Sequence, residues 1–178
     1  MLLVILLSFV LVCDVAGDAG QDSNSSGLFQ WEPISNKVCF HAKGDLPGII
    51  YMHKTGFIVA IKLVYRSGAM KCVATDTGSN WGCDDNTKIN VVVADSKKEI
   101  LFPSKQQVTF AAGNWYTLPG TMSVDEELVL NDFCSPAYVS NGDHLFIWWG
   151  EDHNNYSEGD NSGHVCVKVY ALFQEAQR

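Results

Sequence analysis

Hydrophobic residues alternate with polar ones over short segments, and clusters of Gly, Asn, Asp and Pro separate these segments. The clearest alternation is in residues 56–68, where one face is apolar and the other carries Lys62 and Arg66. The apolar positions of this segment are Phe57, Val59, Ile61, Leu63 and Tyr65. A period of two residues predicts a β-strand with one buried face.

The same pattern predicts nine further strands, at residues 38–42, 48–53, 71–74, 89–94, 99–102, 115–118, 128–130, 145–149 and 165–173. About ten short strands separated by turn residues predict an all-β domain, a β-sandwich or jelly roll. No segment keeps helical spacing over three turns. The predicted domain covers residues 29–174, between a flexible polar lead-in at 18–28 and a short polar tail at 175–178.

An apolar run at residues 2–13 is followed by small residues. The run is shorter than the roughly 20 residues of a membrane span, and its length suits the hydrophobic region of a secretory signal peptide. Val15 and Gly17 are small enough for the positions recognised at cleavage, so we predict a signal peptide at 1–17. The mature chain would then be secreted, with no membrane span.

Five cysteines remain after removal of residues 1–17, and an odd number in an oxidising compartment predicts two bridges and one residue left over. Cys72 and Cys83 flank a short polar loop, which makes their pairing the simplest. Cys39 and Cys166 lie on the first and last predicted strands, which often neighbour each other in sandwiches. We therefore predict the bridges Cys72–Cys83 and Cys39–Cys166 and leave Cys134 over.

The mature chain carries 19 acidic and 12 basic residues, a net charge of −7. This charge repels nucleic acid and anionic membranes and leaves cations, basic proteins and neutral glycans as partners. Two sequons predict N-glycosylation at Asn24 and Asn155. Since Asn155 falls within the segment after Trp149, we expect that segment to lie at the surface.

That segment, "WWGEDHNNYSEGDNSG" at 148–163, contains four carboxylates and no Lys or Arg. Calcium prefers several oxygen ligands, and glycines permit the tight backbone of a calcium loop. We predict that calcium binds to five side chains within eleven residues: Glu151, Asp152, Glu158, Asp160 and Asn161. The spacing is not that of an EF-hand. A solvated acidic turn is the alternative, and the acidic patch at residues 83–86 has the same two interpretations.

Trp148 and Trp149 directly precede the acidic segment. Adjacent residues of a strand point to opposite faces, so one ring can be buried while the other is available to a sugar. These two residues are therefore the predicted glycan-binding residues of a calcium-dependent lectin. Aromatic side chains at strand ends more often belong to the core. The others that could extend a sugar-stacking face are Trp81, Trp115, Tyr116 and Tyr156.

The sequence contains no Gly-x-Ser-x-Gly, His-Glu-x-x-His or Gly-x-x-x-x-Gly-Lys motif. Glu151 and Asp160 could serve glycoside hydrolysis only if one had a raised pKa in an apolar cleft. His153 and His164 could hold zinc if the acidic segment formed a hairpin. A polar surface loop explains these residues more simply, so we predict no catalytic residue.

The stretches "HLFIWWGED" and "SEGDNSGHVCVKVYALF" within residues 144–173, with "IKLVYRSGAMKC" and "SNWGC", resemble secreted cnidarian proteins of the coral skeletal organic matrix. This resemblance implies an extracellular matrix context and assigns no binding residue. The first hypothesis is therefore a secreted, non-enzymatic matrix component of the kind found in calcified skeletons, whose acidic loop binds calcium or a mineral surface. The alternative is a calcium-dependent secreted lectin that binds glycans, and a secreted hydrolase ranks third.

Overall fold

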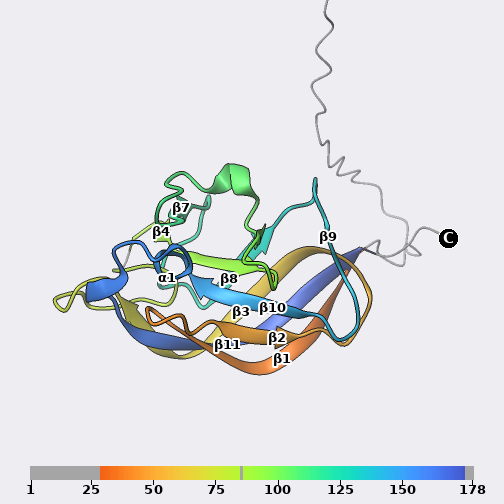
Figure 1. The fold of residues 1–178 in the computed structure, drawn as a ribbon, viewed down its shortest axis with the longest axis horizontal. Coiled ribbons are helices and arrows are strands. Elements are labelled where there is room, and N and C mark those ends of the chain that lie inside the picture. Colours follow the sequence, from red (N-terminus) through yellow and green to blue (C-terminus); the bar gives the residue numbers. More distant parts are fainter. Residues whose placement is uncertain (1–28, 85, 175–178) are drawn as a thin grey trace, which may run out of the picture.

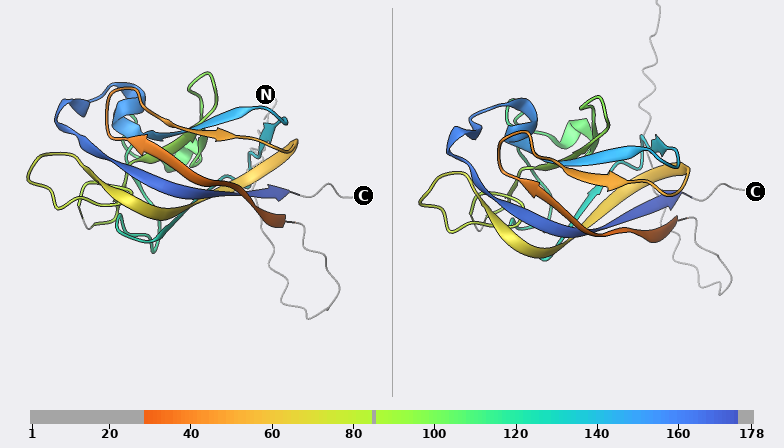
Figure 2. Two further views of the ribbon diagram at one scale, coloured as in Figure 1. Left: turned by 90° about the horizontal axis from the view of Figure 1, so that it is seen from below. Right: turned by 60° about the horizontal axis from the view of Figure 1, so that its bottom comes forward.

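The computed structural model describes residues 29–84 and 86–174 of the 178-residue chain. Two antiparallel sheets lie face to face (Figures 1 and 2), which confirms the predicted all-β sandwich with two disulfides. The signal peptide, the sequon at Asn24 and the polar tail lie outside the described residues. No helix in the described part of the chain is long and apolar enough to cross a membrane.

The first sheet has the order β1 (Phe29–His41), β11 (Ser162–Gln174), β3 (Gly56–Lys71), β8 (Glu127–Asn131), and β9 (Ala137–Val139) also pairs with β3. The second has the order β2 (Gly48–Tyr51), β10 (His144–Trp149), β5 (Val91–Ala94), β6 (Ile100–Phe102). A small ribbon joins β4 (Lys88–Ile89) to β7 (Tyr116–Thr117). The described residues also form three short helices: η1 (Lys105–Gln107), α1 (Gly150–Asn154) and η2 (Glu158–Asp160).

The hydrophobic core fills the space between the two sheets. Residues that contribute to it with no exposed surface include Phe40, Ile50, Ile61, Val93, Ile147 and Val167. The alternation that predicted the strands is visible in β2 and β8, where buried and exposed residues follow one another. β5 is buried along its whole length, which is typical of a strand covered on both faces.

The central strand β3 contains a bulge that the sequence pattern did not reveal. Val59, Ile61 and Leu63 are buried, as predicted. Phe57 was expected on the same buried face, but it is half exposed, and Ile58 enters the core instead. On β11, consecutive residues pair with Ile58 and Ala60, so Val59 is an extra residue in the ladder. Such a residue shifts the alternation by one position.

Several predicted boundaries are wrong. β1 begins at Phe29 rather than at Val38, because its pairing with β11 changes register between Pro33 and Val38 and hides the alternation. Of the predicted strand at 71–74, Lys71 is the last residue of β3 and residues 72–74 form a turn, in which the Asp76 carboxylate accepts hydrogen bonds from the backbone N–H groups of Cys72 and Val73, at 2.8 and 2.9 Å. Strand β9 and helix α1 were not predicted.

Both predicted disulfides are present. Cys39 and Cys166 are directly opposite each other on β1 and β11, with Cα atoms 4.0 Å apart, so the expectation that the first and last strands are neighbours is confirmed. Cys72 and Cys83 close the loop that follows β3, with Cα atoms 5.2 Å apart. Cys134, which we expected to be left over, is not a free thiol, and its partner is not among the described residues.

Candidate functional site

The acidic segment forms two short helices at one end of the sandwich, at the left of Figure 1. α1 starts directly after β10, and Asn155 ends it in the left-handed conformation with φ 50°. Gly150 permits this abrupt turn, because a Cβ atom there would lie 2.8 Å from the Asn90 amide nitrogen and from the Gly113 carbonyl oxygen. The segment is therefore built against the loops that precede β5 and β7.

Glu151 is an interior anchor of this end rather than an exposed loop residue. Glu151 is only 8 % exposed. Its two carboxylate oxygens accept hydrogen bonds from Trp115 Nε1 at 2.9 Å and from Asn161 Nδ2 at 2.8 Å. The Glu151 backbone N–H also donates to Asn90 Oδ1 at 3.1 Å. Protein donors therefore hold both carboxylate oxygens of Glu151 in place, and the metal-binding role predicted for this residue stays a prediction.

Asp152 and Glu158 bring two carboxyl groups into contact. Asp152 is fully buried and accepts the backbone N–H groups of Asp45 and Leu46, at 2.9 and 3.4 Å. Glu158 accepts the Gly44 N–H at 3.3 Å. The hydrogen bond with the Asp152 side chain, followed by partial burial, raises the pKa of Glu158, and the charges of Asp152 and Asp45 act in the same direction. The carboxyl groups of Asp152 and Glu158 are thus in direct contact.

The other predicted calcium ligands are placed differently. Asp160 is exposed on η2, and Asn161 is buried, with its Oδ1 atom making no hydrogen bond. Among the described residues, one group of three His, Cys, Asp or Glu side chains has ligand atoms within 4.8 Å of one another: Cys72, Asp76 and Cys83. In that group the two cysteines form a disulfide. The calcium site therefore stays a prediction, and its best-placed residues are Asp152 and Glu158.

Trp148 and Trp149 are 5 % and 0 % exposed, so neither ring is presented to solvent for stacking on a sugar. Trp149 packs edge-on against Trp115, with ring centroids 5.8 Å apart. Trp148 packs edge-on against His153, and the Lys98 ammonium lies 4.4 Å from the centre of its ring. We expected one of the two rings to face outward, but the structure covers both, because α1 and the loop after β5 close over this end of β10.

The histidines of the acidic segment have different partners. His153 is buried, with its Nε2 atom 3.0 Å from the Lys98 carbonyl oxygen. His164 lies on β11 directly opposite His41 of β1. The zinc hypothesis for His153 and His164 required a hairpin that would bring them together, and each histidine packs against other residues instead.

An exposed aromatic pair lies beside this end of the molecule. Phe110 and Tyr156 are 46 % and 40 % exposed and meet edge-on, with ring centroids 5.5 Å apart. Phe110 and the half-buried Trp115 also line a cleft of about 410 Å³, together with Cys83, Asn86, Lys88, Thr109, Tyr116 and Thr117. The sequence analysis considered Tyr156 and Trp115 but missed Phe110, which follows η1 in a loop without strand periodicity.

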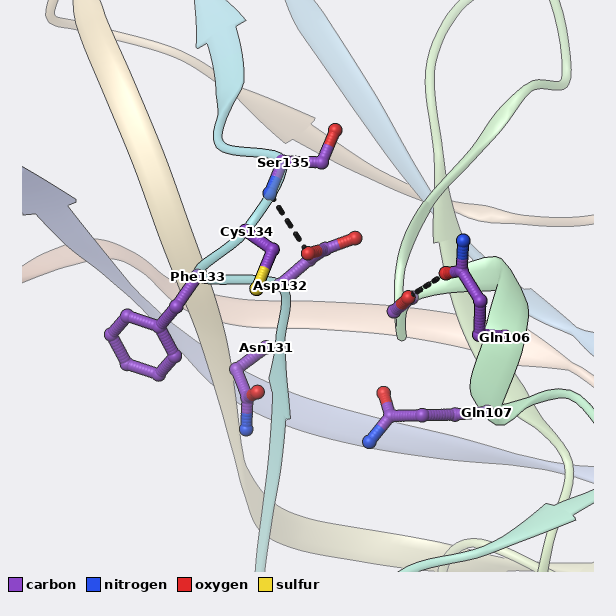
Figure 3. Close-up of a pocket in the computed structure, with 8 residues that line it drawn as sticks. Gln106, Gln107, Asn131, Asp132, Phe133, Cys134 and Ser135 are labelled. Carbon is purple, nitrogen blue, oxygen red and sulfur yellow. Dashed lines mark hydrogen bonds between the residues drawn. The ribbon is translucent and has the colours of Figure 1, made fainter. Parts of the chain in front are cut away.

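A second pocket, of about 630 Å³, lies between η1 and the turn from β8 to β9 (Figure 3). Gln106 and Gln107 come from η1 and face Asn131 and Asp132 across the gap. Asp132 accepts the backbone N–H of Ser135 at 2.9 Å. The remaining residues that line the pocket are Ser104, Phe133 and Cys134. Sequence reasoning missed this pocket because its two sides come from segments about 25 residues apart and neither contains a known motif.

The fold and the two disulfides define the chain as a disulfide-bonded antiparallel β-sandwich. No protein-family model and no curated protein matches the chain. Among solved structures, AJLec, a lectin of the sea anemone Anthopleura japonica, matches with a TM-score of 0.75 and 31 % sequence identity. The match covers 81 % of this chain and 97 % of that one. The chain therefore belongs to the AJLec family.

This membership confirms the cnidarian resemblance in its general form. It favours the lectin alternative over the matrix hypothesis, because the related protein is a lectin and nothing in the comparison supports a role in a calcified skeleton.

Proposed function

We propose that the chain is a secreted, non-enzymatic lectin that binds glycans. The observation on which this proposal rests is the similarity to AJLec, at 31 % identity over 97 % of that lectin. Two features of the molecule support it. Disulfides are typical of proteins that function in an oxidising, extracellular environment. The net charge of −8 for the whole chain favours neutral glycans over polyanions as ligands.

The proposed glycan contact is the cleft beside Phe110 and Trp115, with Tyr156 at its edge. Small-ligand sites combine apolar and aromatic walls with a few polar groups in clefts of about 300–1,000 Å³, and this cleft of about 410 Å³ fits that range. Its polar groups are those of Asn86, Lys88, Thr109 and Thr117. The Trp115 indole is also bonded to Glu151, so the wall of the cleft is fixed to the acidic segment.

Calcium is the proposed cofactor, bound by Asp152 and Glu158. The hydrogen bond with Asp152, together with partial burial and the charges of Asp152 and Asp45, raises the pKa of Glu158, and a divalent cation between these groups would favour their ionised forms. Asp45 is a further carboxylate close to this point, since its charge also acts on Glu158. When bound, calcium would complete its coordination with water, backbone carbonyls or sugar hydroxyls. Hydrogen bonds from the backbone of Gly44 and Asp45, in the loop between β1 and β2, connect this loop to Glu158 on η2 and to Asp152 on α1.

A glycan array probed with the secreted protein, in calcium and in chelator, tests the function. We expect binding that weakens in chelator and is lost in Phe110→Ala. The matched control is Phe57→Ala, since Phe57 is 49 % exposed and forms a similar edge-on pair with Tyr138 at 5.3 Å. Failure of the wild-type protein to bind any glycan in calcium would overturn the lectin proposal.

Persistent binding by Phe110→Ala would refute the cleft as the glycan site while leaving the lectin function intact. In that case Asn131→Ala in the pocket of Figure 3 is the next variant to test.

A further inference from the structure

Two exposed histidines face each other across the pairing of β1 with β11. His41, the last residue of β1, is the direct partner of His164 on β11. Their ring centroids are 5.3 Å apart, and the ring planes are inclined by 30°. Both side chains are on the outer surface of the five-stranded sheet, because Phe40 and Val165 beside them point into the core.

The backbone beneath this pair is fixed on both sides. Cys39 and Cys166 lie two positions away on the same face, and their Cα atoms are 4.0 Å apart. Since narrow and wide pairs alternate along an antiparallel ladder, His41 and His164 also occupy a narrow pair. On the other side, the Ala42 N–H donates to the Gly163 carbonyl at 3.1 Å. The two imidazoles therefore project from strands that cannot separate easily.

The ring nitrogens of the pair are available to a ligand. Within the described residues neither imidazole makes a hydrogen bond, whereas the nitrogens of His153 contact Asn154 and the Lys98 carbonyl. Among the described residues, no third His, Cys, Asp or Glu joins these two histidines in a group whose ligand atoms all lie within 4.8 Å of one another. The protein thus offers two nitrogen donors and leaves the remaining coordination positions open.

We propose that His41 and His164 form a surface site for a late first-row divalent metal ion, Cu²⁺ or Zn²⁺. Imidazole is a preferred ligand of these ions, and Cu²⁺ binds most tightly in this series. Two nitrogens at about 2.0–2.1 Å from one ion lie within about 4 Å of each other. Exposed rings with centroids 5.3 Å apart reach that separation by rotating about their side-chain torsions. Water fills the other positions.

This site is chemically distinct from the proposed calcium site. Calcium takes oxygen ligands, so an excess of calcium should not compete with a metal held by two imidazoles. The site also does not depend on glycan binding, because neither histidine lines the cleft beside Phe110. The negative net charge of the chain favours the approach of a cation.

The test is a calorimetric titration of the untagged secreted protein with Cu²⁺ in excess calcium, followed by electron paramagnetic resonance. We expect one site per chain with two nitrogen donors. His41→Ala and His164→Ala should each weaken binding at least about tenfold, the lower limit for losing even an outer partner of a ligand. Each variant should also show one nitrogen donor fewer in the spectrum.

His144→Ala is the matched control, because His144 is also exposed but packs against Tyr51 rather than another histidine. It should bind Cu²⁺ as the wild-type protein does. Unchanged affinity in either His41→Ala or His164→Ala would overturn the proposal, and so would an equal loss in His144→Ala. Thermal unfolding of each variant without metal checks that the fold is retained.

Discussion

Replacing Trp115 by Phe should remove one of the two side-chain hydrogen bonds that hold the buried Glu151 carboxylate. A hydrogen bond to a charged group contributes about 1.5–3 kcal/mol to stability. For a chain of this size, a loss of 1 kcal/mol lowers the melting temperature by about 2–4 °C. We therefore expect Trp115→Phe to lower it by about 3–12 °C in chelator. Trp31→Phe makes the same chemical change at an exposed site and should cost about 0.5 kcal/mol or less.

Urea unfolding of four proteins isolates the hydrogen bond from the loss of ring volume: wild type, Trp115→Phe, Glu151→Gln and the double variant. Because both changes disrupt the same contact, the double variant should lose less stability than the sum of the single losses. Strict additivity would refute the argument, as would equal stabilities of Trp115→Phe and Trp31→Phe. Either result would mean that the indole contributes nothing to holding the Glu151 carboxylate, which would then depend on Asn161 alone among side-chain donors.

Ile61→Ala should destabilise the protein by about 2–5 kcal/mol in urea unfolding, since Ile61 has no exposed surface, and a loss below about 1 kcal/mol would contradict its central position. Glu158→Gln should raise the melting temperature at pH 7 in chelator and abolish any rise caused by calcium. Because the pKa of Glu158 is raised in the folded protein, its protonated form stabilises the fold. This stabilisation is fully present below about pH 4.5 and is lost as the pH rises through the raised pKa. The increase in melting temperature of Glu158→Gln over the wild type, measured in chelator, should therefore disappear in acid. Gly163→Ala should cost more than about 1 kcal/mol by thermal unfolding, because Gly163 has φ +94° and a Cβ there would lie 2.0 Å from the Ala69 carbonyl oxygen; an unchanged melting temperature would contradict this geometry.

The fold was predictable where a local pattern reports burial directly. Alternation predicted the buried side of β3 at Ile61 and Leu63, and the position of cysteines on the first and last strands predicted the bridge between β1 and β11. The prediction failed at Phe57 because one bulged residue, Val59, reverses the facing of everything before it. A bulge depends on the partner strand, so the pattern within one strand does not reveal it.

The candidate site was less predictable, because its chemistry depends on contacts between distant residues. The sequence shows a carboxylate at Asp152, but the hydrogen bonds that this carboxylate accepts come from the backbone N–H groups of Asp45 and Leu46, more than 100 positions earlier. Likewise, the Trp115 indole that donates a hydrogen bond to Glu151 is 36 positions away in the sequence. Composition therefore drew attention to the acidic segment but could not show which of its carboxylates the protein holds by hydrogen bonds from distant residues.

The surroundings of Lys62 also depend on contacts with other strands that the sequence pattern does not show. Its place on the polar side of β3 suggested an ordinary surface residue. In the structure Lys62 is half buried, pairs with Glu127 at 3.5 Å, and has its ammonium 5.3 Å from the centre of the Trp31 ring. The effect of Lys62→Ala on stability therefore depends on residues of neighbouring strands, and the pattern within β3 alone gives no information about them.

The position of β11 constrains how the protein is made. Among the described strands this one is synthesised last, yet it lies inside the five-stranded sheet, between β1 and β3. Until it emerges from the ribosome, β1 lacks its ladder partner and β3 has one edge unpaired, and unpaired edges of this kind favour aggregation. The bridge between Cys39 and Cys166 also has to wait, because its second cysteine is on β11. The sheet and this disulfide are therefore completed only after β11 has emerged, and the strands made before it stay exposed to aggregation until then.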